Sequence, residues 1–203
     1  MSQLDFEPPD KMPKGAPLAE LLRPQRLGDV VGQDKLIGPD GRLRRMLDQG
    51  ELASIIFWGP PGTGKTTIAR LLADEAGMAF EPVSAVFDGV ADLRKVFARA
   101  ADRLKTGERT LLFVDEVHRF NKAQQDGLLP RVEDGTVTLV GATTENPSFA
   151  LNGALLSRAQ VMVLERLSST ALQALLARVE AHAGHSLPLE ADAREALVAM
   201  ADG

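Results

Sequence analysis

Apolar residues along this chain fall into two alternating patterns. Continuous apolar runs predict buried strands at residues 55–58 and 109–115, and further strands are expected at 80–84, 136–144 and 159–164. Apolar residues at helical spacing predict helices at 41–49, 67–76, 90–105, 121–133, 153–157 and 190–200, and one more that Ser168 or Ser169 caps. This alternation predicts an α/β fold in which a parallel sheet carries helices on both faces.

The loop after the first predicted strand carries the clearest chemistry. It reads Gly59-Pro60-Pro61-Gly62-Thr63-Gly64-Lys65-Thr66-Thr67 and fits the pattern G-x-x-x-x-G-K-[ST] between a strand and a helix. Gly62 and Gly64 let the backbone curl so that its amides point at an anion, and the helix N-terminus adds its positive end. Lys65 would contact the β- and γ-phosphates, and the Thr66 hydroxyl would ligate Mg²⁺. The alternative is a glycine-rich turn with a chance Lys-Thr pair, which the flanking strand and helix disfavour.

Two acids, Asp115 and Glu116, end the apolar run that begins near residue 109. The carboxyl end of a buried parallel strand is where such sheets bind ligands. Asp115 would hold Mg²⁺ directly or through water, and Glu116 would orient and activate the attacking water. The alternative is a solvated strand end, but the phosphate-binding pattern upstream favours the catalytic interpretation.

The next predicted strand ends in polar residues, Thr143 and Thr144, with Asn146 close behind. A polar side chain at this position can hydrogen-bond the water or the γ-phosphate, and simple turn chemistry is the alternative. The histidines, His118, His182 and His185, form no metal-binding pattern, so we expect them to have surface or packing roles.

Composition limits the classes of protein. Hydrophobic residues make up 44% and charged residues 25% of the 203 positions, which is typical of a soluble globular protein. The absence of cysteine excludes disulfides, thiolate metal sites and a cysteine nucleophile. A net charge of −5 argues against a broad basic face for nucleic acid, although a local basic patch is compatible with it.

No signal peptide and no bilayer-length apolar run is visible, so we predict a cytoplasmic protein without membrane contact.

The first sixteen residues are rich in proline and charge, which predicts a flexible lead over 1–16. Within it, Gln3-Leu4-Asp5-Phe6 loosely resembles the short peptides that dock on sliding clamps. A random tail is the favoured alternative, because motifs this short match by chance.

Three stretches together resemble the AAA+ ATPases: the loop from Gly59 to Thr67, Leu112-Phe-Val-Asp-Glu-Val-His-Arg-Phe-Asn-Lys122, and Gly141-Ala-Thr-Thr-Glu-Asn-Pro-Ser-Phe149. They are most similar to the replication-associated recombination protein family (RarA, also called MgsA), which resembles the eukaryotic Werner-helicase-interacting protein. The residues after Asp115 and Thr144 separate that family from clamp loaders and from the RuvB motor. The resemblance covers residues 17–203.

This resemblance implies a five-stranded parallel sheet in the order 5-1-4-3-2, an ATPase core over 17–165 and the start of a helical lid over 166–203. Thr144 would be the sensor-1 residue, with Thr143 and Asn146 as less favoured choices. Arg158 would be an arginine finger that acts in trans, on ATP bound to a neighbouring subunit. The segment around adenine and ribose would consist of Arg23, Pro24, Val30, Val31 and Gly32.

The resemblance also implies ATP and Mg²⁺ as cofactors and hydrolysis of ATP in replication-fork maintenance, recombination and repair. The implied partners are forked, gapped or single-stranded DNA, single-strand-binding protein, replication proteins and further copies of the chain. Family members continue past Gly203 with a sensor-2 arginine and an oligomerisation domain, so this chain is expected to be a fragment with weak activity. Two alternatives stay open: a nucleotide-gated scaffold, and a clamp-loader subunit or branch-migration motor.

Overall fold

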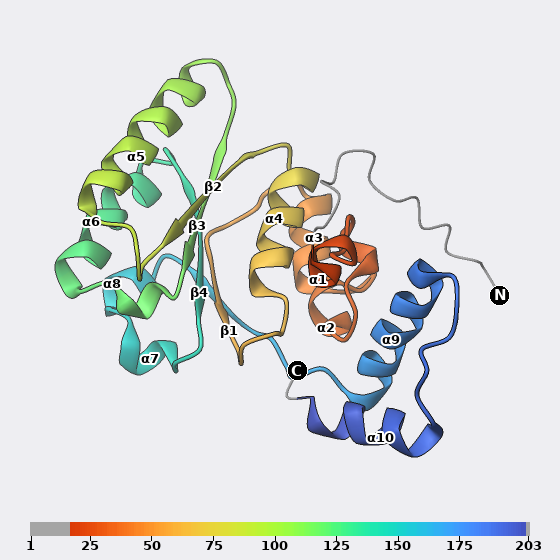
Figure 1. Ribbon diagram of the computed structural model, residues 1–203. Helices are drawn as coiled ribbons and strands as arrows, with labels where there is room; N and C mark the ends of the chain where they lie inside the picture. The colour runs from red at the N-terminus through yellow and green to blue at the C-terminus, as the bar shows by residue number, and fades with distance from the viewer. Residues whose placement is uncertain (1–16, 202–203) are drawn as a thin grey trace.

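The computed structural model describes residues 17–201, and a five-stranded parallel sheet lies at its centre (Figure 1). The strands are β1 Ile55–Trp58, β2 Ala79–Ser84, β3 Thr110–Asp115, β4 Thr138–Thr143 and β5 Gln160–Val163. Their order is β2-β3-β4-β1-β5, and each neighbouring pair is parallel. This is the implied order 5-1-4-3-2 read from the opposite edge, so the predicted fold class is confirmed.

Helices cover both faces of the sheet (Figure 1). One face carries α1 Leu18–Leu21, the 3₁₀ helix η1 Leu27–Asp29, α2 Asp34–Ile37, α3 Arg42–Asp48 and α4 Lys65–Glu75. The other carries α5 Val90–Lys105, α6 Lys122–Glu133 and α8 Gly153–Leu156. The short elements η2 Val117–Arg119 and α7 Pro147–Ala150 follow β3 and β4. Both predicted layers of helices are therefore present.

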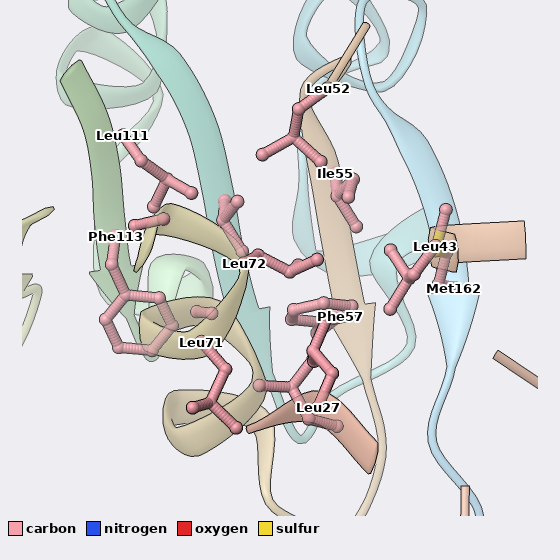
Figure 2. Packing of buried hydrophobic residues seen from close by; sticks show 14 of the residues in the cluster. Leu27, Leu43, Leu52, Ile55, Phe57, Leu71, Leu72, Leu111, Phe113 and Met162 are labelled. Carbon is pink, nitrogen blue, oxygen red and sulfur yellow. The ribbon is translucent and has the colours of Figure 1, made fainter. Parts of the chain in front are cut away.

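Alternate side chains of the strands enter two separate cores. In β1, Ile55 and Phe57 point to the α4 side, whereas Ile56 points to the α5 side. Figure 2 shows Phe57 between Leu72 and Leu27 in the first of these cores. Burying a side chain of this size stabilises the fold by roughly 1.5–3 kcal/mol. Because both faces are covered, the inner strands β1, β3 and β4 are almost continuously buried, whereas the edge strands β2 and β5 carry exposed residues.

The boundaries of β4 differ from the prediction. Its predicted start was residue 136, but the backbone N–H of Thr136 donates to the Asp134 carboxylate at 2.8 Å and that of Val137 to the Arg131 carbonyl at 3.0 Å. These amides belong to the turn after α6, so the strand begins at Thr138. The short helices α1, α2 and α7, of four residues each, were not predicted, although α8, which has the same length, was.

Two helices at the C-terminal end, α9 Ser169–Ala183 and α10 Ala191–Met200, pack on each other beside α2 and away from α5 and α6 (Figure 1). Ser168 caps α9, since its hydroxyl accepts the N–H of Ala171 at 3.2 Å, which settles the predicted choice between Ser168 and Ser169. Arg194 joins α10 to Glu180 of α9 through two hydrogen bonds, at 2.7 and 3.1 Å. Within residues 17–201, no helix has the length and apolar character needed to span a membrane.

Candidate nucleotide site

The loop between β1 and α4 has the backbone that the glycine pattern predicts. Gly62 and Gly64 have φ angles of +81° and +90°, a region that favours glycine. Gly59 has a steric role instead, because a Cβ atom there would lie 2.4 Å from the carbonyl oxygen of Leu164. Gly64 is the N-cap of α4, so the free amides of the first helical turn line the loop. This geometry provides a concave set of N–H donors for an anion.

Lys65 is buried inside this loop, with 8% of its surface exposed. Its Nζ atom donates to the carbonyl oxygens of Gly59 and Pro60, each at 2.7 Å. Burial lowers the pKa of Lys65, and the charges of Glu116 and Asp115 partly oppose this shift. The predicted lysine and the two predicted acids are therefore close enough to interact electrostatically.

The three threonines of the loop differ in their surroundings. The Thr63 hydroxyl donates to the Pro60 carbonyl at 3.0 Å, so this buried side chain closes the turn. Thr66 is half-buried in the first turn of α4, one residue after Lys65. The Thr67 hydroxyl accepts from Nη1 of Arg23 at 3.3 Å, which joins two of the predicted binding residues. Of the remaining loop residues, Pro60 is half-buried and Pro61 is exposed.

The two acids lie at the tip of β3, as predicted. Asp115 pairs in register with Ser84 of β2, and its Oδ1 atom accepts the backbone N–H of Glu116 at 3.2 Å. Glu116 has a φ angle of +51°, the only positive value at a non-glycine residue between 17 and 201. A left-handed conformation costs roughly 1–2 kcal/mol for an L-residue. Strain of this kind is concentrated at functional sites, where surrounding contacts hold it in place.

Of the three candidates at the tip of β4, Thr144 is the one that contacts Glu116. Its hydroxyl donates to Oε2 of Glu116 at 3.4 Å. Thr143 is fully buried, and its hydroxyl bonds the backbone of Glu145. Asn146 caps α7 by accepting the N–H of Ser148 at 3.0 Å. Among these three candidates, only Thr144 has a described hydrogen bond to Glu116, and its sensor-1 role stays a prediction.

Arg158 follows α8, and none of its described contacts is with the loop or with the acids of its own chain. Its Nε atom lies 2.5 Å from Oε1 of Glu133, and Nη1 donates to the Ala154 carbonyl at 2.8 Å. The side chain is 39% exposed. Such a position is compatible with a contact across a subunit boundary.

The predicted adenine segment lies against the start of α9. Gly32 has a φ angle of +80°, and a Cβ atom there would lie 2.8 Å from the Leu167 side chain. The buried side chain of Gln33 joins this segment to Glu165 by two hydrogen bonds. Its Nε2 atom donates to the Glu165 carbonyl at 2.8 Å, and its Oε1 atom accepts the Glu165 backbone N–H at 3.3 Å. Val30 packs against the main core, while Pro24 and Val31 are half-buried. The segment thus lies where the core meets the C-terminal helices.

Sequence reasoning missed three contributors to this region. His118 was expected at the surface or in packing; its side chain is 4% exposed, and its contact with Glu116 was not foreseen. Glu133 was not singled out, although it holds Arg158, and Gln33 was not connected with Glu165. The available signal for His118 was its position two residues after the acids. The clamp-like stretch Gln3-Phe6, for which a random tail was the favoured interpretation, and the lead at 1–16 lie outside the described residues.

The residues present fit a nucleotide with Mg²⁺. The loop amides and Lys65 suit phosphate, while the Thr66 hydroxyl and the Asp115 carboxylate are oxygen donors of the kind Mg²⁺ prefers. Within 17–201 no group of three or more His, Cys, Asp or Glu side chains gathers as a metal site. Mg²⁺ at phosphate sites needs no such group, since one or two protein oxygens, water and the phosphates complete its shell.

Comparison with known proteins agrees with this geometry. Residues 55–167 match the family described as "ATPase family associated with various cellular activities (AAA)". The chain is 46% identical to replication-associated recombination protein A of Escherichia coli strain K12, over 92% of this chain and 43% of that protein. It is 44% identical to ATPase WRNIP1 of Dictyostelium discoideum, over 93% of this chain and 22% of that protein.

Solved structures of the Thermotoga maritima RuvB Holliday junction branch migration motor have a similar fold. One superimposes with a TM-score of 0.63 at 31% identity, covering 80% of this chain and 55% of that one. The chain spans less than half the length of the two relatives compared above. Loop geometry, strand order and sequence similarity lead to one assignment: the chain belongs to the AAA ATPase family, and within it to the replication-associated recombination protein A group.

Proposed function

We propose that this protein binds Mg·ATP in the β1–α4 loop and hydrolyses it. One observation carries this proposal: Glu116, held in a strained backbone conformation, contacts Thr144 and lies within electrostatic range of Lys65. A protein that only binds nucleotide does not need an acid at this position. The arrangement therefore favours turnover over a passive binding site.

Each residue has a distinct part in the proposed reaction. The loop amides and Lys65 bind the β- and γ-phosphates, and Thr66 and Asp115 would hold Mg²⁺, which when bound would supply positive charge beside the phosphates. Glu116 orients the attacking water, and Thr144 fixes the position of the Glu116 carboxylate. Arg23, Pro24, Val30, Val31 and Gly32 border adenine and ribose. Residues 17–165 act as the core, and the helices after 166 form the start of a lid.

Arg158 completes the site of a neighbouring subunit in this proposal. Its described contacts are with Glu133, Ala154 and Ser157, and its side chain is partly exposed, which supports a contact in trans. An arginine finger contributes roughly 10³-fold or more to the rate. Hydrolysis then depends on assembly, and the residues 1–203 alone should turn over ATP weakly.

The cellular role proposed here is remodelling of DNA at stalled or gapped replication forks in the cytoplasm. It rests on the names of the relatives, which refer to replication-associated recombination and, for RuvB, to Holliday junction branch migration. Single-strand-binding protein and replication proteins are the proposed partners. The higher identity to the replication-associated recombination proteins, 46% against 31%, favours that role over a branch-migration motor.

An ATPase assay on the full-length protein tests this proposal. We expect hydrolysis that forked or gapped DNA stimulates more than blunt duplex does. The competing function is a nucleotide-gated scaffold, for which DNA affinity changes equally with ATP and with a non-hydrolysable analogue. Absence of any turnover with all DNA forms, together with retained Mg·ATP binding, would favour the scaffold.

A further inference from the structure

His118 is a buried polar residue that the proposed reaction has not yet used. It lies in η2, the short turn that follows Glu116, and its side chain is 4% exposed. Its Nδ1 atom is 3.3 Å from Oε2 of Glu116 and 3.0 Å from Oγ1 of Thr143. On the other edge of the ring, Nε2 is 3.4 Å from Oε1 of Glu145. The imidazole thus lies between the tip of β3 and the tip of β4.

The hydrogen bonds around Thr143 indicate which ring nitrogen carries a proton. The Thr143 hydroxyl accepts the backbone N–H of Glu145 at 3.0 Å, and its own proton reaches the Glu145 carbonyl at 3.1 Å. With that proton used, the hydroxyl can only accept from Nδ1 of His118. A proton on Nδ1 also suits the Glu116 carboxylate, because an ionised carboxylate only accepts. The network therefore favours a proton on Nδ1, which Thr143 accepts at 3.0 Å and which the Glu116 carboxylate at 3.3 Å can share.

The backbone supports a positioning role over simple packing. The left-handed conformation of Glu116 starts the tight turn that brings His118 back beside the Glu116 carboxylate. Val117, the residue between them, supplies the apolar contact of this turn and has no exposed surface. Apolar packing therefore does not by itself require His118 to lie beside Glu116. The strain is thus associated with placing two polar side chains, Glu116 and His118, at the same strand tips.

We propose that His118 is a positioning residue that holds the Glu116 carboxylate in its working orientation. Thr144 and His118 both contact Oε2 of Glu116, which leaves Oε1 for the attacking water. Thr143 in turn holds the imidazole by accepting from Nδ1. This inference rests on the proposed role of Glu116 in ATP hydrolysis.

Substitution of His118 tests the inference in the full-length protein. In His118→Ala we expect kcat for ATP hydrolysis to fall at least about tenfold, while KM and the affinity for Mg·ATP change less than about threefold. In His118→Asn the amide nitrogen lies near the position of Nδ1, so we expect much of kcat to return. The matched control is His185→Ala, an exposed histidine in the chain after α9, which should leave both constants unchanged.

A double-mutant cycle with Glu116→Gln separates positioning from a purely structural role. If His118 acts through Glu116, adding His118→Ala to Glu116→Gln should cause no further loss in single-turnover hydrolysis. The inference would be overturned if His118→Ala lowered the rate as much in the Glu116→Gln background as in the wild type. It would also be overturned if His118→Asn folded but did not recover kcat. An unchanged kcat in His118→Ala, beside a large loss in Glu116→Gln, would also overturn it. Full turnover in Glu116→Gln would instead refute the proposed function itself.

Discussion

Within one chain, Nε of Arg158 lies 2.5 Å from Oε1 of Glu133, at the end of α6. Both side chains are well exposed, at 39% and 48%, so the pair contributes at most about 1 kcal/mol to stability. A triphosphate carries more charge than one carboxylate and accepts two guanidinium hydrogen bonds. The contact with Glu133 is therefore weak enough for Arg158 to exchange it for a nucleotide on a neighbouring subunit.

Mixed oligomers test the trans role of Arg158. We expect Arg158→Ala subunits to bind ATP normally, and mixtures of Arg158→Ala with Glu116→Gln subunits to hydrolyse ATP faster than either variant alone, because Glu116→Gln supplies the arginine to the intact site of Arg158→Ala. The measurement is steady-state hydrolysis across a mixing series. The control is Arg131→Ala, which removes an exposed arginine from the same end of α6. If the mixtures show only the average of the two pure proteins, the trans role is wrong.

Glu116→Gln should retain Mg·ATP and lose turnover in the full-length protein. The amide keeps a similar shape and a hydrogen bond near Thr144 but cannot accept a proton from water. We expect hydrolysis to fall at least about 10²-fold, as is typical for loss of general base catalysis, with little change in nucleotide affinity. Filter binding and phosphate release measure the two effects. Unchanged phosphate release would refute the assignment of Glu116 as the base.

Local patterns account for the parts of this fold that were predicted closely. The strand β1 ends as predicted because Gly59 stops an unbroken apolar run, and α5 spans the predicted residues because its apolar positions recur between two glycines. The phosphate-binding loop was equally clear, because its pattern is local in sequence. These features depend on neighbours along the chain, so one sequence is sufficient to reveal them.

The parts that could not be predicted depend on contacts between distant residues. Gln33 and Glu165 are joined across 132 positions, and neither residue has a local pattern that indicates the other. Arg158 and Glu133 meet because α6 and α8 end side by side, which depends on tertiary packing. His118 illustrates a third case: a single histidine has many possible roles, and only its neighbours in space distinguish them.

Lys65→Met should remove nucleotide-dependent stabilisation without unfolding the protein. Burial lowers the pKa of Lys65, so its folded pKa lies below the unfolded value of 10.5, and the charged form opposes folding. The resulting cost is fully present below the folded pKa and disappears as the pH rises toward 10.5. At neutral pH, methionine avoids this cost but leaves the carbonyls of Gly59 and Pro60 without their partner. We therefore expect a small change in stability without nucleotide.

Thermal denaturation with and without Mg·ATP measures both effects. A wild-type protein at a nucleotide concentration about 100 times Kd gains roughly 2.7 kcal/mol from binding. We expect this gain to vanish in Lys65→Met and to persist in Lys35→Met, an exposed lysine that pairs with Glu165. An equal gain in Lys65→Met would contradict the proposed phosphate contact.

Gly59→Ala should destabilise the fold even though alanine is a small residue. Its Cβ atom would lie 2.4 Å from the Leu164 carbonyl oxygen, and the N–H of Leu164 is already fixed to the Trp58 carbonyl at 2.8 Å. Because two backbone segments must separate, we expect a loss of about 1–3 kcal/mol, as in overpacked cores. Gly127→Ala in α6 is the control, since nothing lies within 4 Å of its added Cβ. Urea denaturation should show Gly127→Ala to be neutral or slightly stabilising.

Glu81 should make the stability of the chain depend on acid pH. Two arginines surround its carboxylate, Arg99 through hydrogen bonds at 2.9 and 2.6 Å and Arg103 through one at 2.6 Å. The Arg99 hydrogen bonds lower the pKa of Glu81 below 4.5, although burial works in the opposite direction. A lowered folded pKa contributes stability that is present above the unfolded value and is lost as the pH falls through the folded one. The loss therefore begins below about pH 5.

Glu81→Gln removes this contribution and leaves two arginines beside a neutral amide. We expect it to lower the free energy of unfolding at pH 7 by about 1.5–3 kcal/mol, the range for hydrogen bonds to charged groups. The difference from wild type should shrink as the pH falls below 5, because the wild-type carboxylate becomes protonated once the pH passes its lowered folded pKa. Glu108→Gln is the control, since that exposed carboxylate lies 3.9 Å from the same Arg103. Urea titrations at several pH values would contradict this account if the two variants behaved alike.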